Sequence, residues 1–274
     1  MPELPEVENV RRSLLPLVVN RRLGAVRVPD GHLRFPVDTP ALRRALPGRR
    51  ILDIRRRGKY LLFDVEGNRI LLVHLGMTGR LAVVPSRRRR ETHDRVLLSL
   101  EGGEQLRFND ARRFGVVELV SRDVEDGHRL LRHLGVEPLG PAFEAGKLRQ
   151  AARGRRMPIK SFLMDARQVV GVGNIYASEA CFAAGIHPNR PAGGLSLQRW
   201  ERLAASVRAI LGEAITLGGT SFSTFVNAEG SAGRYRRRLM VYGREGESCR
   251  RCRRTVRRVV HSGRSTFYCP GCQH

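Results

Sequence analysis

The spacing of apolar positions changes along the chain and divides it into a first part of strands and a second part of helices. Residues 20–130 carry brief apolar runs rich in β-branched and aromatic residues, separated by turn-forming residues. Many short strands at this spacing predict an antiparallel β-sandwich or barrel. The expected strands lie within residues 51–65, 69–75, 80–84, 95–100, 106–110 and 115–120.

The first residues predict a short helix that precedes the strands. Pro5 suits a first helical turn, where its missing N–H is not needed. Glu6 lies near the positive end of such a helix, and Val7, Val10 and Leu14 fall on one face. We therefore expect this helix to pack on the strands.

After residue 140 the pattern becomes helical. Helices are expected at residues 161–166, 174–184 and 197–217, and Gly218-Gly219 ends the last of them. One apolar stripe runs along that helix and predicts core residues: Leu197, Trp200, Leu203, Ala204, Val207, Ile210, Leu211, Ala214 and Ile215. Residues 220–240 are polar and glycine-bearing, which is typical of a long functional loop.

The net charge of the chain predicts a class of binding partner. Lysine and arginine number 50 against 26 acidic residues, and the formal net charge is +24. The excess predicts a polyanionic partner, most simply nucleic acid; the alternative is an arginine-biased genome that decorates a solvated surface. No apolar run approaches the roughly 18 residues of a membrane span, and the start of the chain does not resemble a secretory signal. We therefore expect a cytoplasmic protein with no membrane partner.

Four of the five cysteines predict a metal site. Cys249, Cys252, Cys269 and Cys272 form the pattern C-x2-C-x16-C-x2-C, which is typical of a structural zinc ion held by four thiolates. The alternative, two disulfides, is disfavoured in a reducing cytosol. The residues between the pairs predict two strands around residues 261–264, which makes a β-hairpin zinc finger. Cys181 lies on an apolar helix face and is expected to be a buried thiol.

The amino terminus has the groups for covalent catalysis. Once the initiator methionine is removed, Pro2 offers a secondary amine that can attack an electrophilic sugar carbon and form an iminium. Glu3 is adjacent and Glu6 lies about one turn further, where a carboxylic acid can act as a general acid. The alternative is that these residues only begin a helix.

Six segments in this order carry a resemblance to a known family: PELPEVE, RRGKYLLF, HLGMTGRL, NDARRFG, VVGVGNIYASEA and GRSTFYCPGC. Together they resemble formamidopyrimidine-DNA glycosylase, a bacterial enzyme family that removes oxidised purines such as 8-oxoguanine, and they span essentially the whole chain. The resemblance implies an α+β multidomain fold. Its parts would be an N-terminal antiparallel β-sandwich with flanking helices (1–135), a helix-two-turn-helix domain (136–240) with a lesion-recognition loop (220–236), and a zinc finger (241–274).

The resemblance also implies the activity, a bifunctional DNA glycosylase and AP lyase of base excision repair. Pro2 would displace the damaged base at C1′, and the resulting imine would lead to strand cleavage by β,δ-elimination. Glu3 would protonate the sugar, Glu6 would support the geometry, and Lys59 would assist beside the lesion phosphate. Arg264 completes the expected catalytic set. One structural Zn²⁺ is the only cofactor expected.

Further residues would bind the DNA. Met77, Arg112 and Phe114 match the residues that fill the hole left by the extruded base, although Met77 and Phe114 could instead be ordinary core. Asp110 and Arg113 would stiffen their loop.

Phosphate contacts are expected elsewhere in the chain. Asn174 begins a helix, where phosphate binds well, and it would grip the strand together with Arg264. His74 and Lys160 are further expected DNA-binding residues. The chain departs from the family pattern after Cys252, where no glycine-proline turn follows, and in the loop 220–236.

Two other functions share these features. An endonuclease VIII-like enzyme for oxidised pyrimidines would also have Pro2, Glu3 and the finger, whereas Met77, Arg112 and Phe114 favour the purine enzyme. A non-catalytic binder of damaged DNA on the same scaffold would explain the charge and the finger equally well. In each case we expect a monomer that binds damaged double-stranded DNA at the bacterial nucleoid.

Overall fold

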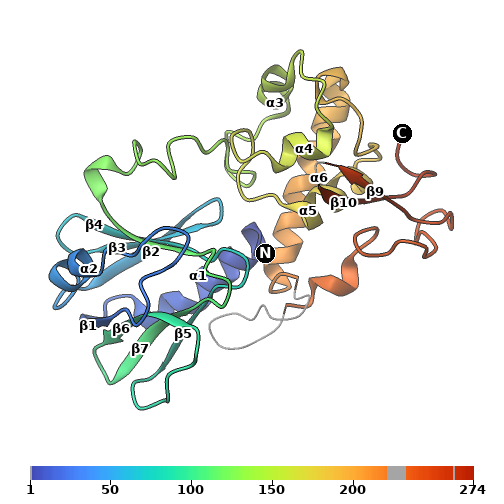
Figure 1. Ribbon diagram of the computed structural model, residues 1–274. Coiled ribbons are helices and arrows are strands. Elements are labelled where there is room, and N and C mark those ends of the chain that lie inside the picture. The colour runs from blue at the N-terminus through green and yellow to red at the C-terminus, as the bar shows by residue number, and fades with distance from the viewer. Residues whose placement is uncertain (1, 221–232, 262) are drawn as a thin grey trace. The chain divides into compact units, whose positions relative to one another are not determined.

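The chain forms two compact units in the computed structural model, which describes residues 2–220, 233–261 and 263–274 (Figure 1). Unit 1 consists of Met1–Arg132 and Gly218–Arg234, and unit 2 consists of His133–Leu217 and Tyr235–His274. The segment Gly218–Arg234 therefore returns to unit 1 after most of unit 2 is complete. The three-domain division expected from the sequence stays a prediction.

Two four-stranded antiparallel sheets form unit 1. One sheet has the order β1 (Leu23–Arg27), β6 (Asp94–Leu100), β7 (Glu104–Asn109) and β5 (Arg80–Pro85). The other has the order β2 (Ile51–Arg57), β3 (Tyr60–Val65), β4 (Arg69–His74) and β8 (Val116–Ser121). Apolar side chains of both sheets, such as Phe63 and Phe108, share one buried core, so the predicted β-sandwich is confirmed.

Helix α1 (Leu4–Val18) is longer than the short helix expected. Val7, Val10 and Leu14 are buried as predicted, and the helix continues past Pro16 because Val18 lies in the same core. Sequence reasoning missed α2 (Thr39–Ala45), although its Asp-Thr-Pro start is a helix-start signal. The Asp38 carboxylate accepts the N–H of Ala41 at 2.9 Å and caps this helix.

Helices dominate unit 2. They are α3 (Ala145–Ala152), α4 (Ile159–Met164), α5 (Asn174–Ala183) and α6 (Leu197–Thr216), with a short 3₁₀ turn (Ala192–Gly194) between α5 and α6. The predicted stripe of α6 is largely buried, but Leu197 at the first turn is 41% exposed and is not a core residue. Trp200 packs edge-to-face on Phe162 of α4, with ring centroids 5.3 Å apart. The helices of unit 2 therefore pack around a hydrophobic core of their own.

The predicted hairpin closes the chain. Strands β9 (Arg257–His261) and β10 (Arg264–Tyr268) pair antiparallel, and His261 lies opposite Arg264. Over the described ranges of the chain, no helix combines the length and the apolar character that crossing a bilayer requires.

Candidate functional site

The amino terminus is held at the first turn of α1. Pro2 is buried, and Glu3 and Glu6 are 3% and 2% exposed. The Glu6 carboxylate accepts the backbone N–H of Glu3 at 2.8 Å through Oε2, and that of Thr220 at 2.7 Å through Oε1. One side chain therefore ties the residues next to Pro2 to the segment that follows α6. An acidic group in this turn also interacts favourably with the helix dipole.

Glycine permits this contact with Glu6. Gly219 has φ of +82°, and a Cβ atom there would lie 2.8 Å from Oε1 of Glu6. Any other residue would therefore be strained and would push the carboxylate away from Thr220. The glycine pair 218–219, expected only to end α6, thus also shapes the site.

Lys59 was expected on a strand, within residues 51–65, but it lies in the turn between β2 and β3, which interrupts that segment. A charged pair joins this turn to α1. Arg56 donates to the carbonyl of Gly58 at 3.0 Å and to the carboxylate of Glu8 at 3.1 Å. Burial raises the pKa of Glu8, but hydrogen bonds from Arg11, Arg12 and Arg56 outweigh it and lower the pKa to about 2. Sequence reasoning missed Arg56, because its partner Glu8 lies 48 residues earlier and no local spacing links the two.

His74 is neutral near pH 7. It ends β4 opposite Tyr60, with ring centroids 4.8 Å apart. Burial, together with the positive charges of Lys59 and Arg34, lowers its pKa to about 4, and the negative charge of Asp110 acts in the opposite direction. Because Nδ1 accepts the N–H of Gly76 at 3.0 Å, the ring hydrogen belongs on Nε2. The side chain can therefore donate a hydrogen bond without carrying charge.

Met77 and Phe114 are not core residues. They are 39% and 44% exposed, which excludes the ordinary-core alternative. The Arg112 guanidinium lies over the Phe114 ring, 4.8 Å from its centroid. Two apolar side chains and one cation thus project from unit 1 as a small set.

The expected phosphate ligands of unit 2 converge on β10. Asn174, at the start of α5, donates to the carbonyl of Ser265 at 3.0 Å. Lys160 is 3% exposed and donates to the same carbonyl at 3.0 Å and to the Thr266 hydroxyl at 2.7 Å. Arg264, the first residue of this strand, is exposed. Lys160 and Asn174 therefore hold the strand that presents Arg264.

Glu179 is a residue that sequence reasoning missed. It is 2% exposed on α5, and its carboxylate accepts the N–H groups of Met240, Val241 and Tyr242 at 2.8, 3.0 and 2.8 Å. Burial raises its pKa, and these three hydrogen bonds act in the opposite direction. The contact anchors the chain that leads into the finger. An acidic residue in the otherwise apolar helix was the available signal.

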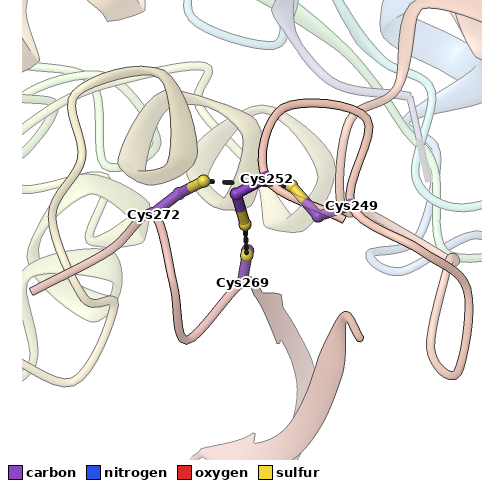
Figure 2. Close-up of side chains that lie close together, drawn as sticks. All are labelled: Cys249, Cys252, Cys269 and Cys272. Carbon is purple, nitrogen blue, oxygen red and sulfur yellow. Dashed lines mark hydrogen bonds between the residues drawn. The ribbon is translucent and has the colours of Figure 1, made fainter. Parts of the chain in front are cut away.

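The four cysteines of the finger form a metal site (Figure 2). Their sulfur atoms lie within 4.8 Å of one another, with Sγ separations of 3.9 Å for Cys249–Cys272 and 3.3 Å for Cys252–Cys269. Four thiolates around zinc at about 2.3 Å lie about 3.8 Å apart, so the residues fit one tetrahedral Zn²⁺. All four cysteines are free, and no position is left open for a substrate. The predicted structural zinc site is therefore supported over the disulfide alternative.

The expected site residues divide between the two units. Unit 1 contains Pro2, Glu3, Glu6, Lys59, His74, Met77, Arg112 and Phe114, and unit 2 contains Lys160, Asn174, Arg264 and the cysteines. Of the expected lesion-recognition loop 220–236, residues 221–232 lie outside the described residues. The roles of the individual residues stay predictions.

Three family models match the chain. Residues 1–117 match the formamidopyrimidine-DNA glycosylase N-terminal domain, and residues 134–226 match the H2TH domain of the same enzyme. Residues 246–274 match a zinc finger found in FPG and IleRS. The matches together extend over most of the chain.

Relatives of similar length and solved structures agree with these models. Formamidopyrimidine-DNA glycosylases of Acidithiobacillus ferrooxidans and Xanthomonas campestris are 50% and 47% identical, with 100% of each chain covered. A Lactococcus lactis FPG mutant bound to DNA that contains Fapy-dG has a TM-score of 0.93 at 34% identity, with 100% of both chains covered. The wild-type protein of that organism, bound to DNA with an oxidised pyrimidine, has a TM-score of 0.91 at 35% identity, again with 100% of both chains covered.

Replacing one zinc ligand should remove the metal. We expect Cys269→Ser to contain clearly less than one zinc per chain and to unfold at lower temperature, because the finger core is built around the cysteines. Cys181→Ala is the matched control, since Cys181 is buried outside the cluster, and it should keep one zinc. Elemental analysis and thermal unfolding measure both. A full zinc content in Cys269→Ser would contradict the assignment.

The low pKa of His74 predicts a pH-dependent stability. The folded-state pKa of about 4 lies below the ordinary value of 6.5, so the unfolded chain binds more protons between these values. The contribution of the neutral ring is complete above about pH 6.5 and is lost as the pH falls toward 4. Denaturant titrations should therefore show the free energy of unfolding of the wild type falling in this window relative to that of His74→Gln. A constant difference between the two proteins would contradict it.

Proposed function

The chain belongs to the formamidopyrimidine-DNA glycosylase family, and from this premise we propose that Pro2 is the nucleophile of a DNA glycosylase and AP lyase that acts on oxidised purines. The observation that carries the proposal is the amino terminus itself, where Pro2 and Glu3 are buried and the Glu6 carboxylate holds the Glu3 N–H at 2.8 Å. A nucleophile gains most when its geometry is fixed before substrate binds.

The reaction begins with the amine of Pro2, which is free once Met1 has been removed. Its nitrogen forms a bond to C1′ while the bond from C1′ to the damaged base breaks and the base departs. Opening of the sugar ring converts the adduct into an iminium between Pro2 and the DNA. Loss of a proton from C2′ then expels the 3′ phosphate, and a second elimination expels the 5′ phosphate. The products are a one-nucleotide gap with phosphate ends and, after hydrolysis of the iminium by water, the free amine of Pro2 and an unsaturated five-carbon aldehyde derived from the sugar.

Glu3 supplies the proton that this sequence needs. It is 3% exposed and adjacent to Pro2, so it can protonate the ring oxygen of the sugar as the ring opens. Glu6 acts through position, because both of its carboxylate oxygens accept backbone N–H groups. The two acids of this turn therefore have different tasks.

Phosphate binding is assigned to groups from both units. Lys59 supplies charge beside the lesion phosphate, and neutral His74 donates from Nε2. In unit 2, exposed Arg264 and the start of α5 at Asn174 bind the backbone, while Lys160 keeps the strand of Arg264 in place. Sequence-independent contacts of this kind provide affinity and register, not lesion choice.

Base extrusion is assigned to Met77, Arg112 and Phe114. Unstacking a base costs a few kcal/mol, and side chains that enter the vacated space offset part of that cost. The exposure of both apolar residues and the stacking of Arg112 on Phe114 support this role. The guanidinium of Arg112 offers donors for the base that has lost its partner.

A second substrate class has one observation in its favour. The Lactococcus lactis relative was crystallised with DNA that contains an oxidised pyrimidine. We therefore include oxidised pyrimidines as a secondary substrate, with purines preferred because the set Met77, Arg112 and Phe114 is complete. The protein is proposed to act as a monomer on damaged duplexes in the bacterial cytoplasm, at the nucleoid.

Replacing the acid should separate the two activities. We expect Glu3→Gln to lower the rate of 8-oxoguanine excision by about 10²–10⁴-fold, the range of general acid catalysis. A preformed abasic site already has an openable sugar, so its cleavage should fall much less. Single-turnover assays on the two duplexes measure both rates. Wild-type excision of 8-oxoguanine by Glu3→Gln would reject the proposed role of Glu3.

Arg264→Ala tests the proposed phosphate contact of the finger, and Arg257→Ala is the matched control for the loss of one positive charge. Arg264→Ala should weaken duplex binding and reduce the salt dependence by about 0.9 in log–log slope per lost phosphate contact, with a smaller effect from Arg257→Ala.

A further inference from the structure

A buried carboxylate lies next to the residues assigned to base extrusion. Asp110 is 0% exposed, and the proposed chemistry does not use it. Burying a carboxylate is costly unless hydrogen bonds compensate, so the partners of Asp110 indicate what it stabilises.

Both carboxylate oxygens bind the segments that carry the extrusion residues. Oδ1 accepts the hydroxyl of Thr78 at 2.6 Å and the N–H of Arg112 at 3.3 Å. Oδ2 accepts the N–H of Gly115 at 2.8 Å. A single side chain therefore fixes the residue after Met77, Arg112 itself, and the residue after Phe114.

Thr78 is the second link between these segments. Its hydroxyl donates to Asp110 and accepts the N–H of Arg112 at 3.2 Å. The first segment joins β4 to β5 and the second joins β7 to β8, so each crosses from one sheet of the sandwich to the other. The Thr78–Asp110 pair therefore joins two separate crossings of the sandwich.

The backbone of both segments depends on this packing. Gly76 has φ of +61°, and a Cβ atom there would lie 2.5 Å from the carbonyl carbon of Phe114. Arg113 has φ of +59°, which costs energy for a residue with a side chain. Its guanidinium pairs with Asp30 at 2.7 Å, and Asp30 also pairs with Arg95 at 2.9 Å.

The same chain of contacts returns to Asp110. Arg95 is 6% exposed, and its Nε donates to the backbone carbonyl of Asp110 at 3.0 Å. The backbone N–H of Asp110 donates to the carbonyl of His93 at 2.9 Å. Hydrogen bonds thus hold both the backbone and the side chain of Asp110. Its carboxylate therefore has a fixed position, from which it binds the β4–β5 and β7–β8 segments.

We propose that Asp110 and Thr78 are positioning residues that hold Met77, Arg112 and Phe114 as one preformed wedge. The inference rests on the proposed function of those three side chains. If the two segments had to become ordered during binding, their lost conformational entropy would add to the barrier for extrusion. A wedge that is ordered beforehand enters the base stack without that additional barrier.

Two substitutions at Thr78 test the pair without burying a new charge. Thr78→Val removes the hydroxyl at nearly constant volume, whereas Thr78→Ser keeps it. Asp110→Asn places an amide N–H₂ group where the carboxylate accepts N–H and O–H donors. Asp64→Asn is the matched control, because Asp64 is another buried acid (4% exposed) of unit 1 and pairs with Arg55 at 2.7 Å, away from the wedge.

The readouts separate extrusion from general folding. Single-turnover excision of 8-oxoguanine is compared with cleavage of a preformed abasic site, which has no base to extrude. The rise in 2-aminopurine fluorescence beside the lesion follows unstacking directly. Borohydride trapping on abasic DNA reports on the covalent step in every variant.

We expect Thr78→Val and Asp110→Asn to slow excision and the fluorescence rise by about tenfold or more, because hydrogen bonds to a charged group are lost. Cleavage of abasic DNA should fall much less, and Thr78→Ser and Asp64→Asn should remain within about twofold of the wild type. The wedge would be overturned if Thr78→Val extruded the base at the wild-type rate. It would also be overturned if Thr78→Val and Asp64→Asn each lost as much activity on abasic DNA as on 8-oxoguanine DNA. A wild-type protein that forms no adduct with abasic DNA would overturn the proposed function and this inference with it.

Discussion

The geometry of the amino terminus depends on the carboxylate of Glu6. A chain end is ordinarily mobile, because few contacts oppose its conformational entropy. Here both oxygens of a residue that is 2% exposed accept backbone N–H groups, one from Glu3 and one from Thr220. This arrangement requires a glycine at position 219, since a side chain there would displace the carboxylate. A residue near the start and residues far along the chain are thus needed together before Pro2 can have a defined position.

Charge has a more limited role than the composition suggests. The net charge of +24 predicts a polyanionic partner, and the family relationship agrees with DNA. Many arginines nonetheless act within the fold: Arg56 and Arg95 bind backbone carbonyls and carboxylates, and Arg107 at 5% exposure pairs with Asp94 at 3.3 Å. His74 is neutral near pH 7, and the proposed nucleophile is an amine of proline. The excess charge therefore accounts for attraction to DNA, whereas the proposed covalent step rests on Pro2.

Local patterns in the sequence predicted the parts of the structure that local patterns determine. All strands of the sandwich except β1, the helix from Leu197 and the four-cysteine finger follow from side-chain periodicity and ligand spacing. The sequence predicted that Asp110 stiffens its own loop, but not its contact with Thr78, nor the contacts of Glu179 with residues 240–242 and of Arg56 with Glu8, because these partners lie far apart along the chain. Met77 and Phe114 illustrate the same limit, since the sequence leaves open whether an apolar residue in a turn is core, and their exposure in the structure excludes that alternative.

The most direct test of the central claim is to locate the covalent bond to DNA. The wild-type protein is incubated with an 8-oxoguanine duplex, reduced with borohydride and digested, and the modified peptide is sequenced by tandem mass spectrometry. We expect one adduct, on the nitrogen of Pro2 in a peptide that lacks Met1. The competing amines are few, because the chain has only the lysines Lys59, Lys147 and Lys160. An adduct on any of these lysines, or on a chain that retains Met1, would show that Pro2 is not the nucleophile.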